Sequence, residues 1–188
     1  MTNPDAQAAR PPANCTVRRA TADDAAAILT IFDEVIEWFV SIGNIEQWGT
    51  EPWSTQPRRI EVVTEACRLP EAWVAEHPEL GVCGAIVLGE AMPYVPSPDR
   101  PEFYVRMLIA SRAPQARGVG RMLMSLADSR AAGAGVEQLR VDCYAGGSGA
   151  LIEFYESWGY LRTGTFDADG WPGQVLVRPL ASEGGATE

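Results

Sequence analysis

A glycine-rich segment with the sequence Gln-Ala-Arg-Gly-Val-Gly occupies residues 115–120, between a β-rich run at 103–110 and an amphipathic helical run at 117–132. A strand that passes to a helix through such a turn directs several free backbone N–H groups, and the positive end of the helix dipole, at one point in space. Such a point binds phosphate groups. The alternative is an ordinary strand-to-helix turn in which the glycines serve only the geometry.

The side chains around the segment suit an anionic ligand that approaches the main chain. Gly118 and Gly120 lack Cβ atoms, so a pyrophosphate can come close to their backbone. Arg112, Arg117 and Arg121 place positive charge beside them. The segment therefore combines free amides, close access and cationic side chains.

Two common phosphate loops are excluded by the residues that follow Gly120. A P-loop requires a lysine and then a serine or threonine, whereas this chain has Arg121 and Met122. A dinucleotide-binding fingerprint requires a third glycine at the position of Leu123. Neither a P-loop nucleotide site nor a Rossmann site is predicted.

A second motif, Ala-Leu-Ile-Glu-Phe-Tyr-Glu-Ser-Trp-Gly-Tyr, occupies residues 150–160, and a predicted helix and strand separate it from the loop. The two motifs together resemble the GNAT superfamily of N-acetyltransferases, with its Gln/Arg-x-x-Gly-x-Gly/Ala loop and its Ala-x-x-(Leu/Phe)-Tyr-Glu-x-x-Gly-Phe signature. The strand before the loop departs mildly from the family pattern, because Arg112 stands where proline is common. The resemblance covers most of residues 16–180.

This resemblance implies the fold class: an α/β protein, layered as α+β, with a mixed, mostly antiparallel sheet of six to seven strands. The central strand pair is expected to splay, and helices are expected on both faces. It also implies an acetyltransferase that uses acetyl-coenzyme A (acetyl-CoA) as cosubstrate. The acetyl group would pass to a primary amine by direct attack in a ternary complex, without a metal ion.

The resemblance further assigns residues to the cosubstrate. Main-chain groups of the strand end pair with the pantetheine arm: Leu108, Ile109 and Ala110. The loop and the start of the next helix hold the pyrophosphate: Gln115, Ala116, Arg117, Gly118, Val119, Gly120 and Arg121. Ser148 stands where many relatives carry an asparagine that contacts the pantetheine, and its side chain reaches less far than that of asparagine.

Four residues have side chains that could transfer a proton. Tyr155 of the second motif can donate a proton to the leaving thiolate, and the alternative is a core tyrosine that only positions the thioester. Glu102 at the start of the central strand is the first candidate for the general base, because relatives often place a glutamate on that strand; a solvated charge is the alternative. Asp142 is the second candidate. His77, the only histidine, precedes a proline and is predicted to be exposed in a turn.

Acceptor recognition is predicted at the first helices and the loop at 43–56. Tryptophans and carboxylates gather there, and together they can surround a cation. The alternative is that the tryptophans pack in a core while the acids are solvated. The candidate acceptor-site residues are Glu34, Trp38, Trp48 and Asp142. A polyamine, an aminoglycoside, an amino acid and a protein N-terminus all stay open as acceptors, so the acceptor is a small-molecule amine or a peptide amine.

Local patterns predict an alternation of strands and helices. A capping box at Thr21 to Asp24 starts the first helix, whose apolar residues recur at helical spacing up to Gly43. Strands are predicted at 17–20, 72–75, 82–88, 103–110, 138–144, 160–166 and 174–178. Further helices are predicted at 57–69, 117–132 and 148–158.

Composition limits the remaining possibilities. The chain has 188 residues, 15 basic and 25 acidic, and its net charge of −10 would repel nucleic acid and anionic membranes. That charge either attracts a cationic amine or only keeps the protein in solution. The four cysteines have no C-x-x-C spacing, so neither a zinc site nor a disulfide framework is predicted. We expect a cytoplasmic protein with one domain at 15–180 and disordered tails at 1–14 and 181–188.

One function from another class is left open. A non-catalytic acyl-CoA sensor, or a module that recruits a protein partner, would keep the loop at 115–120 but would need no general base. The sequence does not set the oligomeric state, although homodimers are the commonest assembly on statistical grounds.

Overall fold

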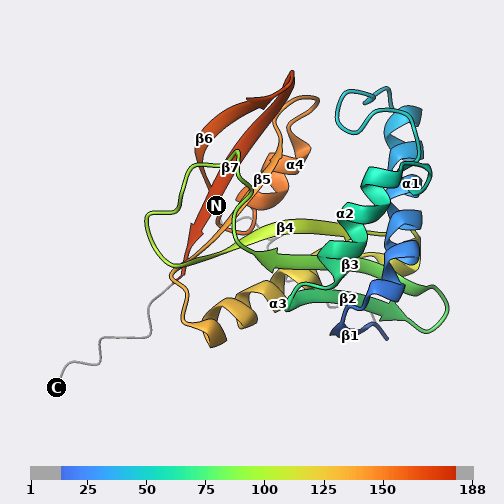
Figure 1. Cartoon of the computed structure of the whole chain (residues 1–188), viewed down its shortest axis with the longest axis horizontal. Coiled ribbons are helices and arrows are strands. Elements are labelled where there is room, and N and C mark those ends of the chain that lie inside the picture. The colour runs from blue at the N-terminus through green and yellow to red at the C-terminus, as the bar shows by residue number, and fades with distance from the viewer. Residues whose placement is uncertain (1–13, 181–188) are drawn as a thin grey trace, which may run out of the picture.

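Seven strands form one mixed sheet within residues 14–180, which are the residues that the computed structural model describes (Figure 1). Their order across the sheet is β1-β2-β3-β4-β5-β7-β6. The strands are β1 (Thr16–Arg19), β2 (Glu71–His77), β3 (Gly81–Gly89), β4 (Glu102–Ala110), β5 (Gln138–Tyr144), β6 (Leu161–Ala168) and β7 (Trp171–Pro179). Only β4 and β5 pair in parallel, so the expected fold class is confirmed with seven strands.

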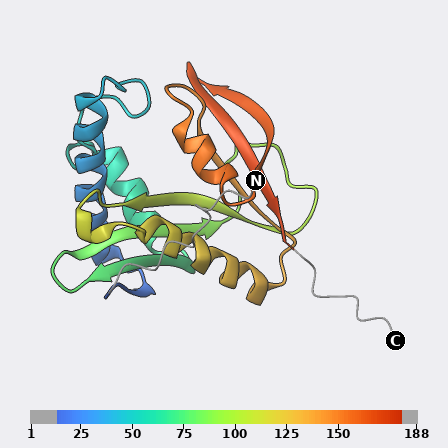
Figure 2. The same cartoon turned by 180° about the vertical axis from the view of Figure 1, so that it is seen from behind.

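Helices cover both faces of this sheet. The α-helices are α1 (Ala25–Ser41), α2 (Pro57–Cys67), α3 (Val119–Ala134) and α4 (Ala150–Glu156), and short 3-10 turns lie at η1 (Ala22–Asp24), η2 (Trp53–Thr55) and η3 (Pro114–Ala116). Figure 1 shows α1 and α2 on one side, and Figure 2 shows α3 and α4 on the other. The predicted tails at 1–14 and 181–188 lie outside the described residues, apart from residue 14.

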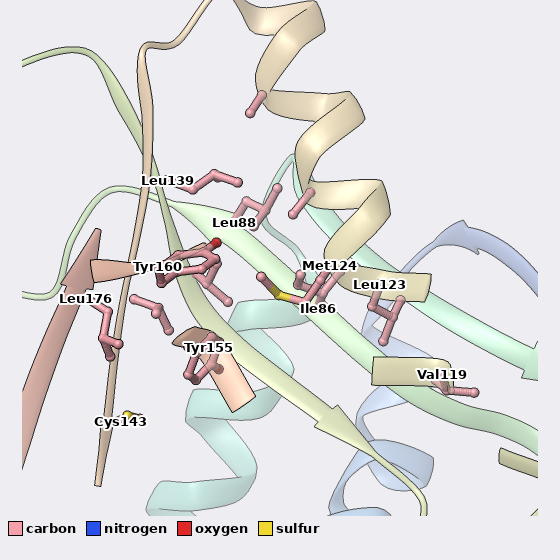
Figure 3. Packing of buried hydrophobic residues seen from close by; sticks show 14 of the residues in the cluster. Ile86, Leu88, Val119, Leu123, Met124, Leu139, Cys143, Tyr155, Tyr160 and Leu176 are labelled. Atoms are coloured by element: carbon pink, nitrogen blue, oxygen red, sulfur yellow. The ribbon is translucent and has the colours of Figure 1, made fainter. Parts of the chain in front are cut away.

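Each helical layer buries its own apolar core against the sheet. One core joins α1 and α2 to residues of β2, β3 and β4. The other joins α3 and α4 to the opposite face, where Val119 and Leu123 of α3 and Tyr155 of α4 are fully or nearly fully buried (Figure 3). Burial of these side chains removes apolar surface from water and fixes both helices on the sheet. The start of α3 and the middle of α4 are thereby held in place.

The central strands part halfway along their length. β4 and β5 pair only from Glu102 to Val105 and from Gln138 to Val141, after which β4 follows β3 and β5 follows β7. A bulge lies at this point, because Val87 and Leu88 of β3 oppose Met107 and Val105, which leaves Arg106 unpaired on β4. Bulges bend a strand and increase its twist. The bulge at Arg106 therefore turns β4 away from β5.

The predicted elements agree with the structure in type and order. The strand at 138–144 is confirmed with the same ends, and the capping box is present, with the Thr21 amide donating to the Asp24 carboxylate at 2.7 Å. The prediction for His77 was wrong: its side chain is buried at the end of β2. Its Nδ1 accepts a hydrogen bond from the Glu79 amide at 3.2 Å, which ties the ring to the turn after β2.

Gly84 of β3 allows α3 to lie against the sheet. A Cβ atom at this position would come within 2.5 Å of Cγ1 of Val119 and 3.0 Å of the Ile109 carbonyl oxygen. We expect Gly84→Ala to lower the free energy of unfolding by about 2 kcal/mol, the usual cost of overpacking. Gly164→Ala in β6 is the control, because no atom lies within 4 Å of its added Cβ. Chemical denaturation of both variants measures the difference, and equal stabilities would contradict this role.

Cys67, Cys83 and Cys143 are buried and have free thiols, and burial raises the pKa of Cys83 and of Cys143 to about 12. No helix in residues 14–180 combines the length and the apolar character needed to cross a membrane.

Candidate active site

A cavity of about 650 Å³ opens where β4 and β5 separate. The second half of β4 forms one wall, residues 141–144 of β5 form the opposite wall, and α1, α2 and α4 close it. The loop at 146–149, ahead of α4, also lines it. The splay of the sheet therefore creates the space in which the predicted site residues can meet.

The edge of β4 that faces this cavity is free to pair. Leu108, Ile109 and Ala110 all line the cavity and hydrogen-bond to β3 on their other side. Beyond Val105, no strand in residues 14–180 pairs with the β5 side of β4. Such an edge offers main-chain donors and acceptors to an extended amide-containing ligand. The three residues predicted for the pantetheine arm thus lie together on one strand edge.

The predicted phosphate loop forms the N-terminus of α3. Gly118 is the N-cap residue, with φ at +92°, a left-handed conformation that favours glycine. Within residues 14–180, the amides of Gly118, Val119, Gly120 and Arg121 donate no hydrogen bond to a backbone carbonyl. They are the unsatisfied donors of a helix start, at the positive end of the dipole of a 16-residue helix.

Some side chains of the loop at 115–121 are buried in the core, and others are exposed to solvent. Ala116 and Val119 are buried in the core beneath the loop, so only their main chains face outward. Gln115, Arg117 and Arg121 are exposed. No atom lies within 4 Å of a Cβ built on Gly120, so the space above it is open. The loop at 115–121 therefore presents free amides, open space and two guanidinium groups on one side of the helix start.

Ser148 lies at the cavity, just before α4. Its hydroxyl oxygen accepts a hydrogen bond from the Ala150 amide at 3.4 Å. The hydroxyl is exposed and retains a donor for a ligand.

Tyr155 points from α4 toward the splay and lines the cavity. Figure 3 shows it beside Tyr160 and Cys143, and its ring centroid is 5.6 Å from that of Tyr160. Burial raises the pKa of Tyr155 above its ordinary value, and the negative forms of Cys143, Tyr160 and Asp142 raise it further. The phenol is therefore protonated throughout the physiological pH range.

Asp142 stands at the apex of the splay, directly after the last paired residue of β5. The hydroxyl of the buried Tyr104 donates a hydrogen bond to its Oδ1, and the Tyr94 hydroxyl lies 3.4 Å from its Oδ2. Burial raises the pKa of the Asp142 carboxyl, and these hydrogen bonds partly offset that rise. A carboxylate with a raised pKa that lines a cavity is a stronger proton acceptor than an exposed one.

The structure places Glu102 elsewhere. It lies at the start of β4, before the splay, and it does not line the cavity. Both carboxylate oxygens accept hydrogen bonds from the Arg140 guanidinium, at 2.5 and 2.8 Å, and both side chains are buried. The expected position of Glu102 on the acceptor side is therefore corrected: its partner is Arg140, and the cavity carboxylate is Asp142.

The acceptor-site residues are only partly brought together. Trp38 and Trp48 line the cavity, as does Asp142. Glu34 is exposed and accepts a hydrogen bond from the Ser111 hydroxyl at 3.2 Å instead. Among the described residues that line the cavity, Asp142 is the only carboxylate. The predicted group of several carboxylates around a cation is therefore not formed.

Sequence reasoning missed Tyr94 and Tyr104, the two hydroxyl partners of Asp142. Tyr94 comes from the loop between β3 and β4, and Tyr104 comes from β4. The contact of Tyr104 with Asp142 depends on the parallel register of β4 and β5, which pairs Tyr104 with Arg140. The contact of Tyr94 depends on the course of its loop. No spacing within a single segment signals such a contact.

Comparison with known proteins agrees with this geometry. The "Acetyltransferase (GNAT) family" profile matches residues 32–160, which is more than half of the chain. The fold is similar to that of a phosphinothricin acetyltransferase from Sinorhizobium meliloti in complex with acetyl-CoA, with a TM-score of 0.63 and 19% identity. That alignment covers 93% of this chain and 92% of the other.

Two further solved structures share the fold. Ard1 from Thermoplasma volcanium has a TM-score of 0.65 and 16% identity, with 89% of this chain and 99% of the other covered. The ribosomal-protein-alanine N-acetyltransferase from Brucella melitensis has a TM-score of 0.63 and 21% identity, with 88% and 99% covered. No curated protein matches the sequence significantly. The profile match over residues 32–160, together with the splayed sheet and the loop at the start of α3, places the chain in the GNAT family of acetyltransferases.

Proposed function

We propose that this protein transfers the acetyl group of acetyl-CoA to a primary amine by direct attack within a ternary complex. The observation that carries the proposal is the arrangement around the splay. One cavity contacts the free edge of β4, the buried phenol of Tyr155 and the carboxylate of Asp142. The free amides at the start of α3 directly follow this edge in the chain.

The loop and the strand edge suit the two polar parts of acetyl-CoA. The amides of residues 118–121 and the guanidinium groups of Arg117 and Arg121 would hold the pyrophosphate. The main chain of 108–110 would pair with the pantetheine amides, and the Ser148 hydroxyl would contact the same arm. Bound in this way, the thioester would lie in the splay beside Tyr155.

Asp142 would act as the general base. An ammonium group must lose a proton before its nitrogen can attack the thioester carbonyl, and Asp142 is the only carboxylate among the described residues of the cavity. The amide bond forms as the carbon–sulfur bond breaks. Tyr94 and Tyr104 would hold the carboxylate in place by donating hydrogen bonds to it.

Tyr155 would donate the proton that leaves with the coenzyme A thiol. We expect Tyr155→Phe to lower kcat about 50-fold, somewhat below the usual range of about 10² to 10⁴ for acid–base catalysis, because a thiolate is already a good leaving group. Steady-state kinetics with calorimetry checks this, and the dissociation constant for acetyl-CoA should not change. Tyr160→Phe is the control, because this neighbouring tyrosine does not line the cavity. Unchanged turnover in Tyr155→Phe would remove the acid role.

Direct attack is favoured over an acetyl-cysteine intermediate. Cys143 lines the cavity, but burial raises its pKa to about 12, so little reactive thiolate exists at neutral pH. The only histidine, His77, lies at the end of β2 and outside the cavity lining. A nucleophilic cysteine would need such a base beside it.

The deciding experiment is a calorimetric titration with acetyl-CoA, with ATP and NAD as controls, followed by an acetyl-transfer assay on a panel of amines. Selective binding and transfer support the proposed enzyme. Selective binding without transfer to any amine would favour the non-catalytic acyl-CoA sensor. Absence of binding by folded protein free of copurified coenzyme A would contradict both functions.

A further inference from the structure

We propose that the acceptor amine carries a negatively charged group, as an amino acid does, and that Arg59 recognises that group. This inference rests on the proposed function, since it concerns the acceptor of the same reaction. It favours the second of the two alternatives for the net charge of −10, namely that this charge only keeps the protein in solution. The charge near the bound acceptor decides its affinity more than the charge of the whole surface does.

A row of four aromatic rings forms the acceptor side of the cavity. The ring centroids of Trp38 and Phe39 are 5.0 Å apart, those of Phe39 and Trp48 are 5.2 Å apart, and those of Trp48 and Trp53 are 5.3 Å apart. All four residues line the cavity. These rings provide a continuous apolar wall for the carbon skeleton of a small acceptor.

An arginine lies over each end of this row. The Arg112 Cζ atom is 3.5 Å from the centroid of the Trp38 ring, and the Arg59 Cζ atom is 4.2 Å from that of Trp53. Both arginines line the cavity, and neither forms an ion pair with a carboxylate in residues 14–180. Stacking holds the guanidinium plane and leaves its N–H groups free for a planar anion such as a carboxylate.

The rest of the cavity lining gives the acceptor a direction. Asp142 lies at the apex of the splay and would receive the ammonium end, while Arg59 lies at the aromatic wall and would receive the anionic end. Arg106 also lines the cavity, but it donates a hydrogen bond to the Glu90 carbonyl oxygen at 3.1 Å. Arg59 comes from α2, on the opposite face of the sheet from α3. The phosphate loop has its own cations, Arg117 and Arg121, so pyrophosphate binding does not account for Arg59.

The experiment compares kcat/KM for amino acids with that for their matched carboxamides. Each pair differs only in the charge of the carboxyl group. We expect the acids to be preferred at least about tenfold, the usual effect of a charged hydrogen bond. Arg59→Met should remove about tenfold of that preference and leave the KM for acetyl-CoA unchanged. Arg59→Lys, which keeps the charge but not the planar group, should give an intermediate preference.

Arg58→Met is the matched control, because Arg58 precedes Arg59 on α2, is exposed and does not line the cavity. It should keep the wild-type preference. Equal kcat/KM values for acids and amides, or an Arg59→Met variant that weakens both equally, would overturn the inference.

A binding measurement separates this inference from the proposed function. Three of the six tryptophans of the chain belong to the aromatic row, so tryptophan fluorescence can be used to follow ligand binding. Titration of the coenzyme A complex with N-acetyl amino acids and with their amides therefore measures recognition without turnover. If no amine is acetylated but the acids bind more tightly than the amides, recognition of an anionic group in the cavity stands and the proposed reaction fails. If transfer occurs without a preference for acids, the reaction stands and the inference fails.

Discussion

Replacing Asp142 by asparagine should lower kcat about 10³-fold at neutral pH, within the range of general acid–base catalysis. Asparagine keeps the shape and can still accept the hydrogen bond from Tyr104, but it cannot take a proton from the acceptor ammonium group. The dissociation constant for acetyl-CoA should stay within about twofold, because the loop at the start of α3 lies outside this contact. Steady-state kinetics with calorimetry measures both quantities.

Glu102→Gln and Asp169→Asn are the comparison variants for this prediction. Glu102 pairs with Arg140 outside the cavity, so its replacement should reduce stability rather than kcat. Asp169 lies in the turn between β6 and β7 with φ at +53°, a conformation that asparagine also adopts, and it is exposed. If Glu102→Gln loses kcat and Asp142→Asn keeps it, the base would be Glu102 or a group that it positions.

The effect of pH on the stability difference between the wild type and Asp142→Asn follows from the direction of the Asp142 pKa shift. Because the pKa of Asp142 is raised in the folded protein, the folded state binds its proton more tightly than the unfolded state does. The stability that comes from this proton is present at low pH and is lost as pH rises through the raised pKa. The uncharged asparagine avoids the cost of a buried charge, so the variant should melt at least as high as the wild type at pH 8.

The Asp142 carboxyl should also determine how the catalytic rate depends on pH. The wild-type rate should rise with pH as Asp142 loses its proton, and this rise should lie above the reference pKa of about 3.9 for aspartate. The rise should be absent in Asp142→Asn. Tyr94 and Tyr104 contact the carboxylate directly, and the Arg106 charge acts on Tyr94. If the rate of Asp142→Asn still rises with pH in the same range, the rise would belong to another titrating group.

The fold was predictable because its signals are local. The strand at 138–144 is an apolar run with clear ends, and the Thr21 capping box marks the first helix from side-chain types alone. The start of α3 was placed two residues early, because an amphipathic pattern continues through Arg117 and Gly118. Only the left-handed φ of Gly118 ends the loop there, and periodicity does not report a backbone angle.

The site was less predictable because its contacts cross the sheet. Glu102 has the residue type and strand position of a base, but the register of β4 and β5 brings it to Arg140 before the splay begins. The same register brings Tyr104 to Asp142 from a distant part of the chain. Arg112 was expected beside the pyrophosphate, whereas it stacks on Trp38 of α1. Each outcome depends on a tertiary neighbour that no single segment encodes.

Replacing Gly120 by valine should weaken acetyl-CoA binding about 100-fold. The added side chain would fill the open space above the first turn of α3 and keep a pyrophosphate away from the free amides. Loss of two charge-assisted hydrogen bonds, at about 1.5 kcal/mol each, corresponds to this factor. Calorimetric titration of the variant with acetyl-CoA measures the change.

Gly133→Val is the matched control. Gly133 lies near the other end of the same helix, and it also has no atom within 4 Å of an added Cβ. Both variants introduce the same β-branched residue into α3, so they carry similar costs in helix propensity. Both should therefore unfold at similar denaturant concentrations, while only Gly120→Val loses affinity. Equal affinities in the two variants would contradict the prediction, because the open space at Gly120 in the first turn of α3 would then not be where the pyrophosphate binds.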